Sequence, residues 1–317
     1  MTVSALPRRR SVGPSDHLYR WGLRLVALVF AALLGALLIS LILKAKPAIS
    51  HNGVGFLTQT RYDPNHAHYG LLAMIVGTLE TTAIALVIAV PLGVAVAVAL
   101  VEYVPARIAS VLGAVVELLA AVPSVVFGLW GLLVISPWFS HTFEPWLKDV
   151  FGWTGLFNGQ PIGVGLLLAG LILAIMILPT MASISRDVIA AVPATTAEAA
   201  TGLGATRWQA VARVIVPISR PGLLGAMVLA AGRALGETIA VTMVIGNTNH
   251  ITHSLLGPSQ TLASLIANEF TEATEPFHLA TLIEAGLLLL VISAVVNTGA
   301  RMMVRAVGRQ SVGAGVV

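Results

Sequence analysis

The sequence predicts an all-α integral membrane protein with about six transmembrane helices. Hydrophobic residues make up 57% of its 317 residues and charged residues only 10%, against about 25% charged residues in ordinary soluble domains. The mean hydropathy of +0.91 leaves too little polar surface for water to solvate a chain of this size. Six apolar stretches are each long enough to cross about 30 Å of hydrocarbon. They lie at 22–43, 72–101, 110–135, 162–184, 222–246 and 279–300.

The first stretch, 22–43, fits either a signal peptide or an uncleaved span. Three arginines at 8–10 form the basic start that both kinds of segment share. The apolar run is longer than the 7–15 residues of a signal peptide, and Lys46 with Pro47 makes a poor cleavage site. We therefore expect an uncleaved first span.

The distribution of Lys and Arg predicts the orientation of the chain. With the N-terminus in the cytoplasm, thirteen arginines fall on the inner side and four Lys or Arg on the outer side, while Arg233 lies within a span. Cytoplasmic loops are enriched in Lys and Arg. We therefore expect a multi-pass protein of the inner, or cytoplasmic, membrane with both termini in the cytoplasm. The expected outer loops lie near 44–70, 136–161 and 247–278.

Several kinds of chemistry lack their residues in this chain. There is no cysteine, which excludes disulfides and Cys-based metal sites. None of the three lysines follows a glycine, so no phosphate-binding loop of an ATPase is present. Histidines in the outer loops fit solvated side chains or, less well, a metal site: His51, His66, His68, His250 and His253. We expect no enzyme activity, no cofactor in this chain and no nucleic-acid partner.

The longest inner loop, 185–221, predicts two short helices outside the membrane. Capping residues, glycines and a proline occur at the spacing of a helix, a glycine turn and a second, amphipathic helix. Such an element fits a groove on a partner protein, although an ordinary interfacial hairpin has the same pattern. The expected boundaries are a cap at Thr195 or Thr196 with Glu198 in the first turn, an end or bend at Gly202 and Gly204, a restart near Thr206 and an end at Pro217.

This loop resembles the EAA loop of binding-protein-dependent ABC importer permeases. The family pattern is Glu-Ala-Ala, three residues, Gly, nine residues and Ile-x-Leu-Pro. The matching residues are Glu198, Ala199, Ala200, Gly204, Val214, Val216 and Pro217, with Val in place of Ile and Leu. The resemblance implies that these residues couple the chain to a separate ATPase.

The resemblance also implies a division of the chain. The type I (MetI-like) permease core would comprise the second to sixth spans, and the first span would be an addition. The expected segments are a cytoplasmic N-terminal tail at 1–21, the additional span at 22–43, the permease domain at 72–300 with its coupling loop at 185–221, and a cytoplasmic C-terminal tail at 301–317.

The fifth apolar stretch contains two opposite charges, Arg233 and Glu237. Each charge at a helix centre costs roughly 2.5–3.5 kcal/mol on insertion scales. The two are four residues apart and can pair on one helix face, while Gly232 and Gly236 permit close approach of another helix. The pair is either a structural lock or part of a solute path. In a path, the guanidinium would bind a tetrahedral oxyanion and Glu237 would orient it and offset its charge.

The run 233–238 resembles the permease pair of phosphate importers, PstC and PstA, and stretches 77–82, 123–131 and 266–270 agree. The Phe-Gly-Leu-Trp-Gly sequence at 127–131 is more similar to the PstC member. The resemblance implies that Arg233 and Glu237 take part in phosphate passage. Its implied partners are a homologous second permease, two ATPase subunits and a periplasmic or lipid-anchored phosphate-binding protein, in contact with membrane lipid.

Other functions stay open at this point. A permease of the same fold for another oxyanion or small solute shares most of these features. A partner-free secondary transporter or a membrane enzyme is the alternative from another class, although no internal repeat supports it. Within the spans we expect Glu80, Glu117 and Glu284 to pair or to reach the surface, and Pro91, Pro123 and Pro179 to kink or break their helices.

Overall fold

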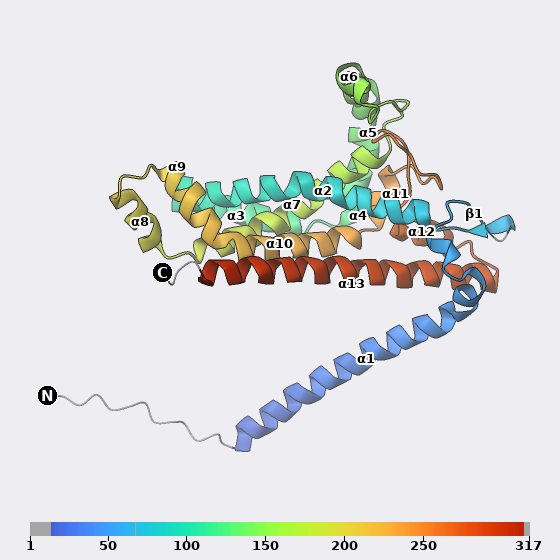
Figure 1. The fold of residues 1–317 in the computed structure, drawn as a ribbon, viewed down its shortest axis with the longest axis horizontal. Coiled ribbons are helices and arrows are strands. Elements are labelled where there is room, and N and C mark those ends of the chain that lie inside the picture. The colour runs from blue at the N-terminus through green and yellow to red at the C-terminus, as the bar shows by residue number, and fades with distance from the viewer. Residues whose placement is uncertain (1–13, 67, 314–317) are drawn as a thin grey trace.

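The structure is a computed structural model that describes residues 14–66 and 68–313, and it is almost entirely helical (Figure 1). Within these residues, six helices are long and apolar enough to cross a membrane. This agrees with the predicted fold class. The six are Leu18–Asn52, Leu72–Tyr103, Ser124–Thr154, Leu166–Ala190, Arg207–Leu235 and Pro276–Ala306.

A bundle of long helices forms the body of the molecule. Helices α2 (Leu72–Val98) and α7 (Leu166–Ala190) pack along most of their lengths, and α10 (Val216–Leu235) and α13 (Pro276–Gly313) complete the bundle. The contact of α2 with α7 depends on small residues. A Cβ at Gly170 would lie 2.5 Å from a side-chain carbon of Ile84, so only glycine allows this approach. Pro91 and Pro179 lie inside α2 and α7 without interrupting them.

Helix α1 (Pro14–Asn52) lies apart from the bundle and meets it only near its end, as Figure 1 shows. Ala45 and Ala48 are fully buried there, and α1 packs against α13. The apolar side chains earlier in α1 are exposed. The helix is longer than the predicted stretch 22–43, and the three arginines at 8–10 lie outside the described residues.

The third predicted span, 110–135, is not one helix. Helix α3 (Ala106–Ala120) ends before Pro123, and α4 (Ser124–Trp130) begins after it. Proline has no N–H to continue the helical ladder, and the break expected at Pro123 is confirmed. The helix then continues as η4 (Gly131–Ile135), α5 (Ser136–Trp138), η5 (Phe139–Phe143), α6 (Glu144–Phe151) and η6 (Gly152–Thr154).

This continuation corrects the expected loop at 136–161. The segments η4 and η5 are π-helical, and together with α5 and α6 they carry the helix well past residue 135. Figure 1 shows α6 standing out to one side of the bundle. The aromatic rings of Trp138, Phe143 and Trp146 stack in succession along it. The helical conformation brings the three rings of this Trp-x4-Phe-x2-Trp sequence together.

The fifth predicted span, 222–246, also differs. Its helix begins earlier, at α9 (Arg207–Ala210), and passes through the π-helical η7 (Val211–Ile215) into α10. The prediction that Pro217 ends a separate helix is wrong. In η7 the N–H of Val216 donates to the carbonyl of Val211, and this wider turn brings Pro217 into the first turn of α10 without a break. The helix ends at Leu235, and a new helix, α11 (Ile239–Val244), begins after three intervening residues.

The two ends of the bundle carry different elements. At one end lie η1 (Gly55–Leu57), a short antiparallel hairpin of β1 (Tyr62–Asp63) and β2 (His68–Tyr69) around η2 (Pro64–His66), and helix α12 (Leu262–Glu269). At the other end lies α8 (Ala194–Gly202), between α7 and α9 (Figure 1). We call these the hairpin end and the α8 end.

Candidate functional site

Arg233 lies in the last turn of α10 and is exposed on the bundle. Its Nη1 donates a long hydrogen bond of 3.5 Å to Oγ1 of Thr180 on α7. Thr180 directly follows Pro179, which lacks a backbone N–H and so removes one hydrogen bond from the α7 helix next to this hydroxyl. Since a guanidinium has five N–H donors, most of its donor capacity remains available to a solute.

Glu237 does not pair with Arg233, and the predicted ion pair is therefore wrong. Helix α10 ends at Leu235, so residues 233 and 237 no longer share one helix face. The Oε1 of Glu237 instead accepts a 3.2 Å hydrogen bond from the backbone N–H of Ala240, in the first turn of α11. No ion pair joins Arg233 to a carboxylate among residues 14–66 and 68–313.

The predicted close approach of helices at Gly232 and Gly236 holds for Gly232 only. A Cβ at Gly232 would lie 3.4 Å from the side-chain oxygen of Asn297 on α13. A Cβ at Gly236 would meet only the backbone of its own preceding turn, at 3.8 Å. Gly236 instead follows the last residue of α10, with the right-handed dihedral angles φ −92° and ψ 0°.

The predicted helix, glycine turn and helix are present at the α8 end. Helix α8 begins at Ala194 after Pro193, without a side-chain cap, so the expected cap at Thr195 or Thr196 is wrong. Glu198 accordingly lies beyond the first turn. The helix ends at Gly202, and the restart near Thr206 is confirmed by reciprocal hydrogen bonds between Thr206 and Gln209.

Gly204 is the residue of this turn whose identity is fixed by its backbone. Its φ of +88° lies in the left-handed region that side chains disfavour. In this conformation its N–H donates to the carbonyl of Thr201, and the N–H of Ala205 donates to that of Ala200, which closes the C-terminus of α8. The side chain of Leu203 is then 90% exposed at the tip of the molecule.

The matched EAA residues differ in exposure. Glu198 and Ala199 are exposed and Ala200 is partly buried. Their neighbour Ala197 contacts an apolar cluster that includes Val211 and Ile215. Ala197 thus anchors α8 to the bundle, and the exposed carboxylate of Glu198 lines a hollow beside this contact.

One ion pair in the bundle was only half anticipated by the sequence. Arg186 on α7 donates from Nη2 to Oε1 of Glu117 on α3, at 2.9 Å. Glu117 was expected to pair between helices, but the break at Pro123 places it opposite Arg186, which was expected in the inner loop. Glu284 is buried and accepts a 3.1 Å hydrogen bond from Asn52 at the end of α1.

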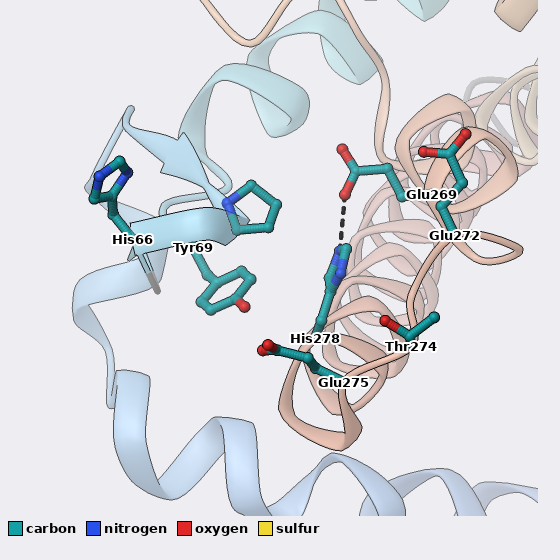
Figure 2. A pocket seen from close by; sticks show the side chains of 8 residues that line it. His66, Tyr69, Glu269, Glu272, Thr274, Glu275 and His278 are labelled. Carbon is teal, nitrogen blue, oxygen red and sulfur yellow. Dashed lines mark hydrogen bonds and ion pairs between the residues drawn. The ribbon is translucent and has the colours of Figure 1, made fainter.

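The hairpin end holds a cavity of 720 Å³ lined by side chains that Figure 2 displays. Three glutamates, Glu269, Glu272 and Glu275, gather around it. His278 lies 2.9 Å from Glu269, as the dashed line in Figure 2 marks. Three carboxylates repel an oxyanion, so this cavity is a poor anion site.

The buried phenol of Tyr62 connects two of the residues that line this cavity. The hydroxyl of Tyr62 on β1 donates to Oε2 of Glu269 and lies 3.2 Å from Nε2 of His278. Burial, and then the hydrogen bond to Glu269, raises the pKa of Tyr62. The cluster ties the hairpin to the end of α12 and the start of α13.

Two of the histidines expected in the outer loops, His66 and His51, have defined neighbours in the structure. His66 forms a 2.7 Å contact with Asp63, which lowers the pKa of that carboxyl. His51 packs edge-on against Phe277, with ring centroids 5.0 Å apart. No group of three or more His, Cys, Asp or Glu in the described part of the chain is arranged to hold a metal ion.

Comparison with known proteins decides the family. The model of the binding-protein-dependent transport system inner membrane component matches residues 89–309. The phosphate transport system permease protein PstC of Mesorhizobium japonicum is 43% identical over 91% of this chain and 90% of that protein. The chain belongs to the PstC group of binding-protein-dependent transport permeases. It is a transport permease subunit, not an enzyme.

Other members of the group agree. PstC of Haemophilus influenzae is 45% identical over 91% of this chain and 93% of that protein. PstC 1 of Mycobacterium tuberculosis is 38% identical and covers 98% of this chain and 99% of that protein. The coverage extends to both ends of the bundle, α1 included.

Solved structures support the fold. A chain of the MetNI methionine ABC transporter, in an inward-facing conformation, aligns with a TM-score of 0.52 at 19% identity and covers 78% of this chain and 99% of that chain. A chain of a bacterial alginate ABC transporter aligns with a TM-score of 0.51 at 16% identity, covering 94% and 98%. The fold is that of MetI-like permeases, as the resemblance implied.

Proposed function

We propose that this chain is the PstC-type permease subunit of an ATP-driven importer that moves inorganic phosphate into the cytoplasm. The names and 38–45% identity of the PstC relatives support the substrate. The structural observation that carries the mechanism is Arg233, an exposed guanidinium that follows the uncharged stretch 221–232 of α10 and has no carboxylate partner among the described residues.

Arg233 attracts phosphate because its positive charge is not offset. The carboxylate of Glu237 is engaged with α11, and the single long hydrogen bond to Thr180 leaves donors for the anion. A guanidinium binds two phosphate oxygens at once. In our proposal, Glu237 shapes the site by fixing the break between α10 and α11 rather than by holding Arg233.

The proposed orientation places the α8 end and both termini in the cytoplasm, in the inner or cytoplasmic membrane. The excess of Lys and Arg in cytoplasmic loops supports it. The arginines around the α8 end are Arg107, Arg186, Arg207, Arg213 and Arg220, whereas the basic residues around the hairpin end are Lys44, Lys46 and Arg61, and Lys148 lies on α6.

The proposed partners follow from the exposed surfaces. A homologous second permease, of the PstA type, faces Arg233 and completes the path. Two ATPase subunits bind the coupling elements, here through Glu198, Ala199, Ala200 and the turn at Gly204. A periplasmic or lipid-anchored phosphate-binding protein delivers phosphate at the hairpin end, and lipid covers the remaining apolar surface.

Phosphate uptake by vesicles that contain the assembled importer tests the role of Arg233. Arg233→Gln removes a charge-assisted interaction worth about 1.5–3 kcal/mol, so we expect uptake to fall about 10- to 100-fold. Arg220→Gln is the matched control, because Arg220 is an exposed arginine on the same helix near the α8 end. Near-normal uptake by Arg233→Gln, with normal assembly, contradicts the proposal.

Transport of another oxyanion by the same fold is the second candidate, because a guanidinium also binds other tetrahedral anions. Competition separates the two. If sulfate or molybdate replaces labelled phosphate as the preferred substrate of the native importer, the phosphate assignment fails while the role of Arg233 remains.

A further inference from the structure

An apolar groove of 430 Å³ lies on the side of the bundle toward the α8 end. One wall comes from α2 and η3 (Ala99–Tyr103), between Pro91 and Tyr103, and the other from the helix between Trp208 and Val216. Every lining side chain is apolar except for the polar tips of Tyr103 and Trp208, and no charged side chain enters the groove. The second wall belongs to the coupling loop 185–221, but the proposed ATPase contact uses Glu198, Ala199, Ala200 and the turn at Gly204, and none of these lines the groove.

The length of the groove matches one leaflet of a bilayer. Pro91 and Tyr103 are twelve residues apart, which corresponds to about 18 Å along a helix. Half of the roughly 30 Å hydrocarbon core is about 15 Å. Tyr103 and Trp208, 44% and 67% exposed, are the side chains that prefer the membrane surface. The groove thus runs from the surface to about the midplane.

A cation stands at the surface end of the groove. The guanidinium of Arg207 lies over the ring of Tyr103, 5.3 Å from its centroid. Glu102 and Glu198 line the hollow on the other side of Arg207. Neither forms an ion pair with it among the residues that the structure describes. No carboxylate lines the groove itself, so on the Tyr103 side the guanidinium is placed to bind an anion at the end of the apolar groove.

We propose that this groove binds an acyl chain of an anionic phospholipid, with the headgroup phosphate on Arg207. Basic sites between membrane helices select anionic headgroups in this way. The orientation of the proposed function places this lipid in the cytoplasmic leaflet, so that part rests on it. Because Arg207 and Trp208 begin the helix that follows the coupling turn, the lipid sits beside the start of the ATPase-coupled segment.

A fluorescent label inside the groove tests the proposal. The chain has no cysteine, so Ala95→Cys carries a bimane label at an exposed position of the groove wall. The complete importer is placed in vesicles with equal fractions of brominated phosphatidylglycerol or brominated phosphatidylcholine, since bromine quenches bimane on contact. We expect phosphatidylglycerol to occupy the groove about fivefold more readily.

Variants of Arg207 identify the headgroup contact. Arg207→Gln removes the preference for phosphatidylglycerol, and Arg207→Lys keeps most of it. The control is a bimane on Val87→Cys, 74% exposed, two helical turns from Ala95 on the same face of α2 and outside the groove. There the two lipids quench alike.

Two results overturn the proposal. Equal quenching by both lipids at position 95 means that the groove is filled by bulk lipid only. Absence of quenching by either means that a protein surface, such as the second permease, covers the groove. Vesicles with brominated phosphatidylglycerol in one leaflet separate the lipid site from the orientation. If phosphatidylglycerol is preferred only in the leaflet that corresponds to the outer side of the cell membrane, the proposed orientation is wrong and the lipid site remains.

Discussion

At the scale of single residues, the charges in the fifth span show how a break in a helix changes the meaning of a sequence pattern. Arg233 and Glu237 have the spacing of an ion pair, yet the chain leaves the helix between them. The carboxylate then serves α11, and the guanidinium remains exposed. The sequence identified both residues as unusual but not their separate surroundings.

Substitution of Glu237 distinguishes an acceptor from a charge. Glu237→Gln keeps an oxygen for the N–H of Ala240, so we expect the stability and most phosphate uptake to persist. Glu237→Ala removes the acceptor and should cost about 0.5–2 kcal/mol, as for other helix caps. Thermal unfolding of the purified subunit and uptake by vesicles measure both. Loss of uptake in Glu237→Gln with unchanged stability would show that the charge itself is needed.

Tyr62 gives a second prediction at this scale. Tyr62→Phe removes a hydrogen bond to a carboxylate, and we expect a loss of about 1.5–3 kcal/mol, measured by thermal unfolding. The hydroxyl must keep its proton to donate, and its pKa is raised above the usual 10.0. This stabilisation is therefore complete below pH 10 and lost only as the pH rises through the raised pKa. His66→Ala, at an exposed position, is the control and should change the stability little.

At the scale of elements, hydropathy predicted which segments are long and apolar, but backbone chemistry decided where helices stop. Pro217 lies inside a continuous helix, whereas Pro123 separates two. Proline is tolerated at residue 217 because the preceding turn widens and its missing donor lies in the first turn of α10. Pro91 lies in the interior of α2 without such a widened turn beside it. Such local adjustment is not visible in a window of apolar residues, and for this reason the third and fifth spans were misplaced.

The turn at Gly204 is the element-scale prediction. A side chain in the left-handed conformation costs roughly 1–2 kcal/mol per residue, and asparagine tolerates it better than valine. We expect Gly204→Val to weaken co-purification of the ATPase and the coupling of ATP hydrolysis to uptake, and Gly204→Asn to be milder. Gly202→Val cannot serve as the control, because Gly202 is the last residue of α8 and the substitution would change the helix itself. Normal coupling in Gly204→Val would contradict the role of this turn.

At the scale of the whole molecule, the six spans and the MetI-like arrangement were predictable because bilayer thickness fixes span length. The position of α1 was not. Its apolar sequence fits lipid on all sides, and small residues occur along its whole length, yet of its described side chains only Ala45 and Ala48 near its end are buried. The hairpin between β1 and β2 was likewise unexpected, because two-residue strands leave almost no alternating pattern.

The orientation of the molecule is testable by labelling. Two positions suit a single introduced cysteine. Leu203, at the α8 end, is 90% exposed, and Trp153, beyond α6, is 85% exposed. We expect a membrane-impermeant maleimide to label Trp153→Cys in intact cells and Leu203→Cys only after the membrane is opened. The absence of native cysteines removes background. The reverse pattern would refute the proposed topology.

The helix from Arg207 to Leu235 passes from the coupling turn to Arg233 without interruption. These two points are 26 residues apart, or about 39 Å along a helix. We expect an uninterrupted helix of this length to move as one rigid body. If the proposed ATPase tilts the first turn of this helix, we expect the far end and the guanidinium to move with it, while the break after Leu235 leaves α11 behind. In the proposed function, displacement of Arg233 from Thr180 is then the expected result of the ATPase cycle.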